Sequence, residues 1–166
     1  MEVSYKGLSN KRNETFLSVL SAGLFLILVG MIFVTTPNLF DKIVTFFKDF
    51  DIVSVPYSNV RLPAPQHPET HSTLYSAVWT FSFIWSLFEI ILLVLRFLTR
   101  SQLTKKAETM SNIVFWLGTT FLINRFLSET TTNETWFMFW TTIIMLLGVS
   151  LVIRAIILAI ARPEHS

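Results

Sequence analysis

Residues 15–34 read TFLSVLSAGLFLILVGMIFV and contain no charged side chain. A hydrocarbon core of about 30 Å needs roughly 20 apolar residues in a helix, so this stretch is long enough to cross a bilayer. Basic residues precede it, as they do in a signal peptide. However, the apolar run is longer than the usual stretch of about 7–15 residues, and no small-x-small cleavage site follows it. We therefore predict an uncleaved first transmembrane helix over 15–34.

The composition of the whole chain agrees with a membrane protein. Of the 166 residues, 52% are hydrophobic and 14% are charged, and the mean hydropathy is +0.56. Soluble domains carry about 25% charged residues. The chain has no cysteine, which excludes disulfides and thiolate metal sites. A net charge of +2 is too small to indicate nucleic-acid binding, so the expected partner is the lipid bilayer.

Three further stretches extend this pattern. Residues 73–98 and 135–161 are long apolar runs, whereas 107–127 carries Asn112, Asn124 and Arg125 toward its ends and no charge over 113–123. We predict an all-α integral membrane protein, a four-helix bundle of transmembrane helices over 15–34, 73–98, 107–127 and 135–161. The connecting segments are then 1–14, 35–72, 99–106, 128–134 and 162–166.

The basic residues predict the orientation. With the N-terminus inside, nine of the thirteen basic residues lie on the cytoplasmic side and four on the outer side. Basic residues concentrate on the cytoplasmic side of membrane proteins, so both termini are predicted to be cytoplasmic. We expect the protein in the cell (plasma) membrane.

The outer segment 35–72 contains two different patterns. In 37–50, apolar residues recur at helical spacing opposite charged ones, which predicts a short amphipathic helix in the outer interface. The alternative is that its apolar side covers protein, and the rings offered to a partner are then Phe40, Phe46, Phe47 and Phe50. The loop 51–72 is rich in proline and has no glycine, so we expect an extended, stiff connection.

Two constellations of polar residues carry candidate chemistry. His67, Glu69 and His71 precede the second span, and imidazoles with a carboxylate bind Zn or Cu. Since His67 would lie before the helix, a solvated loop is the simpler interpretation. No cofactor is otherwise predicted.

The second constellation lies inside the membrane and comprises Glu89, Arg96, Asn112 and Arg154. Buried ionisable residues in membranes usually have a partner. We expect Glu89 to pair with Arg154, with Asn112 or Arg96 contributing. The alternatives are arginines that reach the headgroups while Glu89 is protonated, or a proton or ion path.

No nucleophile motif and no phosphate-binding glycine loop is present. We therefore expect a non-catalytic accessory subunit that binds other membrane protein subunits. The first alternative is a homo-oligomeric channel or transporter that uses Glu89 and Arg154. The second is a metal-dependent membrane enzyme that uses His67, Glu69 and His71.

Overall fold

The computed structural model describes the backbone of residues 2–160 and the side chains of residues 12–160. The predicted tail 162–166 and the last residue of the predicted span 135–161 lie outside the described residues, as does Met1. The elements are, in chain order, α1 (Glu2–Thr35), α2 (Leu39–Lys48), β1 (Phe50–Ser54), β2 (Arg61–Pro65), the 3-10 helix η1 (Pro68–His71), α3 (Ser72–Leu98), α4 (Leu103–Phe126) and α5 (Asn133–Ile160).

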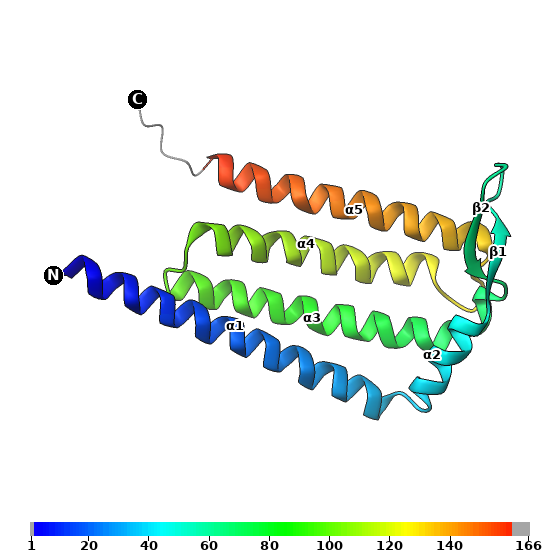
Figure 1. The fold of residues 1–166 in the computed structure, drawn as a ribbon, viewed down its shortest axis with the longest axis horizontal. Coiled ribbons are helices and arrows are strands. Elements are labelled where there is room, and N and C mark those ends of the chain that lie inside the picture. Colours follow the sequence, from blue (N-terminus) through cyan, green and yellow to red (C-terminus); the bar gives the residue numbers. More distant parts are fainter. Residues whose placement is uncertain (1, 161–166) are drawn as a thin grey trace.

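The four long helices run alongside one another, and the short elements gather at one end (Figure 1). We call residues 36–71 the cap and this end of the molecule the cap end. The first turns of α1 and the last turns of α5 lie at the opposite end (Figure 1). The helix α1 is continuous from Glu2, so the predicted segment 1–14 is helical where it is described.

Three helices are long and apolar enough to cross a membrane: Arg12–Thr35, Pro68–Leu98 and Asn133–Ile160. They indicate a membrane location and several passes through the bilayer. The fourth long helix, α4, does not have this apolar character by itself. Several of its polar residues are instead buried, among them Thr109, Ser111 and Thr120.

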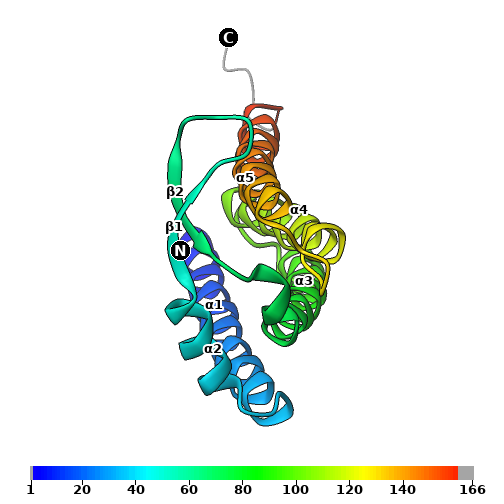
Figure 2. The same ribbon diagram turned by 90° about the vertical axis from the view of Figure 1, so that its right-hand side faces the viewer.

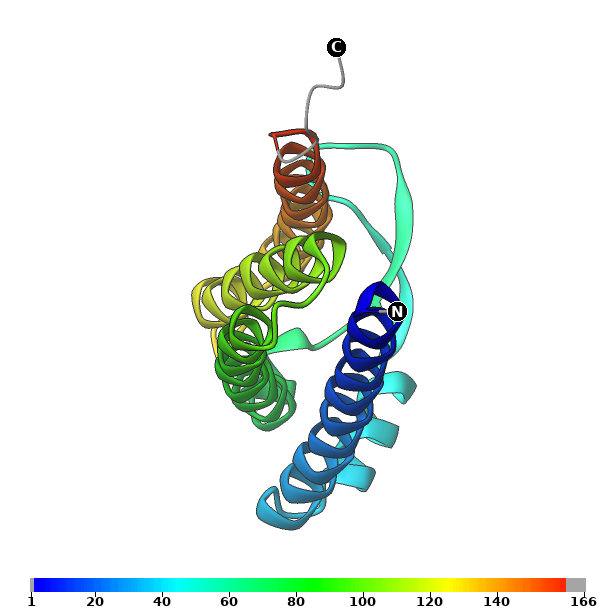
Figure 3. The same ribbon diagram turned by 90° about the vertical axis from the view of Figure 1, so that its left-hand side faces the viewer.

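The long helices lie side by side in a row. The helix α1 packs on α3, α3 packs on α4, and α4 packs on α5. Viewed from either end, α1 and α5 lie at the two ends of this row (Figures 2 and 3). Leu28, Ile32 and Trp85 form the core between α1 and α3, whereas Leu122, Ile123 and Phe139 join α4 to α5.

The helix α2 starts later than its sequence predicts. Thr36 and Pro37 suggest a helix start, but α2 begins at Leu39, after Asn38 in the left-handed conformation (φ 52°). Asparagine tolerates this conformation better than most residues, so it can turn the chain sharply away from α1. The turn lays α2 across the end of α1 (Figures 1 and 2).

Part of the proline-rich loop forms a β-hairpin, which the sequence does not predict. β1 and β2 pair antiparallel, with Phe50 opposite Pro65 and Ile52 opposite Pro63. Hydrogen bonds from Gln66 N to Asp49 O (2.8 Å) and from Val55 N to Val60 O (2.9 Å) bracket the ladder. Because hydrogen-bonded pairs alternate with non-bonded ones, both prolines fall at positions that need no N–H toward β1. The prolines are therefore compatible with the strand, and they remove donors from its free edge.

Candidate functional site

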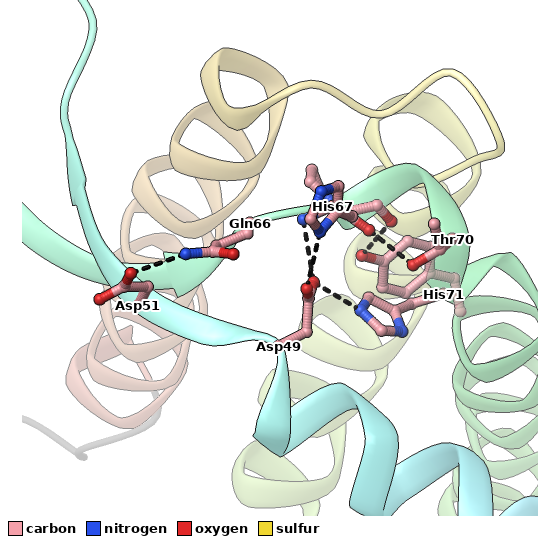
Figure 4. Close-up of polar contacts among 8 residues, drawn as sticks. Asp49, Asp51, Gln66, His67, Thr70 and His71 are labelled. Atoms are coloured by element: carbon pink, nitrogen blue, oxygen red, sulfur yellow. Dashed lines mark hydrogen bonds and ion pairs between the residues drawn. The ribbon is translucent and has the colours of Figure 1, made fainter.

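The carboxylate of Asp49, directly after α2, is the centre of a polar cluster in the cap (Figure 4). Its Oδ1 lies 3.0 Å from His67 Nδ1, and its Oδ2 lies 2.9 Å from His71 Nε2. The backbone N–H of His67 also donates to Oδ2, at 2.9 Å. Since an ionised carboxylate can only accept hydrogen bonds, each imidazole donates a hydrogen bond to it. We call Asp49, His67 and His71 the carboxylate latch.

The latch joins three elements that are distant in sequence. Asp49 follows α2, His67 follows the hairpin, and His71 ends η1 next to α3. Pro68 opens η1 and His67 precedes it, as the sequence predicts. Thr70 Oγ1 donates to His67 O at 2.7 Å, which orders the turn between the two histidines. Both ends of the hairpin are therefore attached to the start of α3.

Burial and hydrogen bonding act in opposite directions on the latch carboxyl. Burial raises the pKa of Asp49, but the hydrogen bonds from His67 and His71 outweigh it and leave this pKa below its ordinary value. The same carboxylate raises the pKa of His67 by hydrogen bonding and by its charge. The His71 side chain is 5% exposed, whereas that of His67 is 62% exposed. One histidine of the latch is thus buried and the other is exposed to solvent.

Aromatic rings pack beneath the latch. Phe46 contacts the His71 ring edge-on, with 5.1 Å between the ring centroids, and also contacts Trp136 of α5. Phe50 lies against Trp136 as well. Of the four phenylalanines expected to face a partner, Phe46 packs within the chain because α2 turns this side toward α3 and α5, and Phe50 packs within the chain from the start of β1. Phe40 and Phe47 remain exposed.

The metal-site hypothesis placed His67, Glu69 and His71 together, but the structure brings together the two histidines and Asp49 instead. Glu69 is exposed and lines a separate cavity with Glu129. Within residues 12–160, no group of three or more His, Cys, Asp or Glu side chains is arranged to hold a metal ion. Sequence reasoning missed Asp49, because the hairpin that returns the chain to it was not predicted.

The intramembrane constellation is divided by α4. Glu89 is buried on α3, and its Oε1 accepts a hydrogen bond from Asn112 Nδ2 on α4, at 3.4 Å. The neighbouring Ser111 points toward α5 instead, and its hydroxyl donates a hydrogen bond to Ser150 O at 2.7 Å. Adjacent residues on a helix point about 100° apart, so α4 contacts both neighbours through polar groups.

This arrangement changes the expected pairing of Glu89. Within the described residues Glu89 and Arg154 form no ion pair, and α4 packs between the helices that carry them. Arg96 instead donates from Nη1 to Lys105 O and Thr109 Oγ1. Asn112 is thus the partner of Glu89 that the structure provides, and Arg96 fastens the start of α4 to the end of α3.

Comparisons with known proteins return no similarity: no protein-family model, no curated protein and no solved structure matches this chain.

Proposed function

We propose that this chain is a non-catalytic accessory subunit of a larger membrane protein assembly, with four membrane spans and a cap that binds a partner on the outer side. The observation that carries the proposal is the exposed apolar surface of the hairpin. Ile52 and Tyr57 are 66% and 97% exposed, and Val60 and Leu62 are exposed as well. Such residues in the aqueous or headgroup region are typical of protein contact surfaces.

The latch supports this proposal because it fixes the hairpin. Asp49 holds the chain on both sides of the strands, Ala64 forms a buried cluster with Tyr75 and Trp136, and Val53 packs against that cluster. A surface that is ordered before binding loses less conformational entropy when a partner docks. The hairpin is therefore a preorganised contact surface and not a flexible tether.

The packing of α4 supports a fourth span. Its 24 residues reach about 36 Å at 1.5 Å per residue, enough to cross the hydrocarbon core. Its polar side chains bond to α3 and α5, and such internal bonding is what permits polar residues inside a bilayer. With four spans, nine of thirteen basic residues fall on one side, which favours cytoplasmic termini in a plasma membrane protein.

The test is purification of the full chain from its native membrane in mild detergent, followed by mass measurement of the intact complex. We expect a stable mass that includes foreign subunits. The double substitution Ile52→Ser with Tyr57→Asn should reduce the recovered complex at least tenfold. Asparagine suits position 57, where φ is 61°.

The matched control is Ser54→Ala with Arg61→Gln, which changes polar positions of the same hairpin and should keep the complex. Recovery of the chain only as a monomer or as whole multiples of its own mass would contradict the proposal.

A second candidate function rests on Glu89, a buried carboxyl group hydrogen-bonded across α3 and α4. Such a group in a membrane is expected in proton or ion transport. Purified protein in liposomes would then carry a proton or ion flux that Glu89→Gln abolishes, and this result would favour the channel or transporter over the accessory subunit.

A further inference from the structure

Two cavities meet beside α2 at the cap end. The one that extends along α3 toward the middle of that helix, which we call the apolar slot, has a volume of about 190 Å³ and an entirely apolar lining that includes Ile32, Phe33, Leu39, Ile43, Ala77 and Phe81. The outer one has a volume of about 330 Å³ and a polar lining of Asn38, Asp41, Lys42, Thr45, Thr70 and His71. Leu74 lines both cavities, so the two adjoin.

The change in polarity coincides with the ends of two membrane-spanning candidates. Ile32 and Phe33 lie in the last turn of α1, and Leu74 lies in the first turn of α3. The apolar lining continues from there along α3 to Ala77 and Phe81, toward the middle of the helix. In a bilayer, acyl chains give way to headgroups at the ends of the spans. The pair of cavities thus follows the polarity of a lipid along its length.

The charged side chains in the outer, polar cavity indicate which kind of headgroup would fit it. Asp41 and Lys42 both line it, and neither forms an ion pair within the described residues. One acid and one base are complementary to a group that carries a phosphate and an amine or ammonium. The imidazole of His71 is already bonded to Asp49, which leaves Lys42 as the cation for the phosphate.

We propose that these cavities bind one zwitterionic glycerophospholipid of the outer leaflet, with the phosphate at Lys42, the amine or ammonium at Asp41 and an acyl chain in the apolar slot. This site is separate from the exposed hairpin face, so it does not depend on the proposed partner. The lipid would pack between α1, α2 and α3, where α1 packs on α3.

The experiment uses the full chain in vesicles of phosphatidylcholine and phosphatidylglycerol that contain a phosphatidylcholine with a photoreactive acyl chain. After illumination, the labelled peptides are identified by mass spectrometry. We expect labelling centred on residues 29–43 and 74–81. Ala77→Phe fills the slot and should reduce this labelling at least fivefold. Val78→Trp narrows the slot from a partly exposed position and should act in the same direction if Ala77→Phe fails to fold.

Two controls separate a site from lipid that merely surrounds the helices. Ala22→Phe changes an exposed position of α1 and Lys48→Ala a lysine of α2 that lines neither cavity, so both should label as the parent does. Lys42→Glu should lower labelling by the zwitterionic probe, and soluble glycerophosphocholine should fail to compete because it has no acyl chain. Equal labelling in all variants, or equal labelling by a photoreactive phosphatidylglycerol, would overturn the proposal.

Discussion

The carboxylate of Asp49 accepts hydrogen bonds from two imidazoles and a backbone amide, so its ionisation determines how firmly the cap is held. The pKa of Asp49 is lowered, so its contribution is present above the unfolded value of about 3.9 and is lost as pH falls through the lower folded value. The pKa of His67 is raised, so its contribution is complete below about 6.5 and is lost as pH rises through the higher folded value.

We therefore expect the hairpin to be held most firmly between about pH 4 and 6.5 and to loosen as pH rises above this window. A spin label on Ser58→Cys reports hairpin mobility without an intrinsic pH dependence, and the chain has no other cysteine. In His67→Ala the change above pH 6.5 should disappear. A pH response of equal size in that variant would show that His67 is not the responsible group.

Two of the three latch residues stand out in the sequence, whereas the third does not because it is distant from them along the chain. His67 and His71 stand out because they are four residues apart next to a predicted helix start. Asp49 lies 18 residues before His67, and only the hairpin brings the two together. No local pattern encodes that contact, so the sequence offers only the neighbouring carboxylate, Glu69, as a partner for the two histidines.

At the scale of elements, Gly118 of α4 lies close against Leu146 of α5. A Cβ atom at this position would lie 2.6 Å from both methyl groups of Leu146, whereas Gly148 has nothing within 4 Å. Gly118→Leu should therefore separate the two helices and destabilise the protein by about 1–3 kcal/mol. Gly148→Leu adds the same side chain at an open position and should have little effect.

Unfolding in mixed micelles, followed by tryptophan fluorescence, measures both glycine variants. Equal midpoints for Gly118→Leu and Gly148→Leu would contradict the packing described for α4 and α5.

A helix could be predicted from the sequence where its apolar residues follow one clear pattern. The helical spacing of the apolar residues in α2 predicts its buried face. The predicted start of α2 is wrong because the helix begins only after the left-handed Asn38. The hairpin was not predicted, because prolines usually exclude a strand and the turn has no glycine. Its prolines are tolerated because the backbone nitrogens of both prolines face away from β1. This placement depends on the register of the two strands.

At the scale of the whole molecule, the order of the helices in the row could not be read from the chain. Hydropathy predicts which segments are apolar, but the contacts of Glu89 depend on α4 lying between α3 and α5. The polar groups of α4 lower its apolar character and at the same time bond it to both neighbours. The segment with the weakest sequence signal thus has a packed helix on each side, α3 and α5.

The central claim is that α4 crosses the membrane, so that the cap and the α4–α5 loop lie on one side and the α3–α4 loop on the other. Single cysteines at Ser58, Thr130 and Gln102 in the otherwise cysteine-free chain can be tested in intact cells with a membrane-impermeant maleimide. We predict labelling at Ser58 and Thr130 from outside, and at Gln102 only after the membrane is opened. Labelling of Thr130 and Gln102 from the same side would contradict the fourth span.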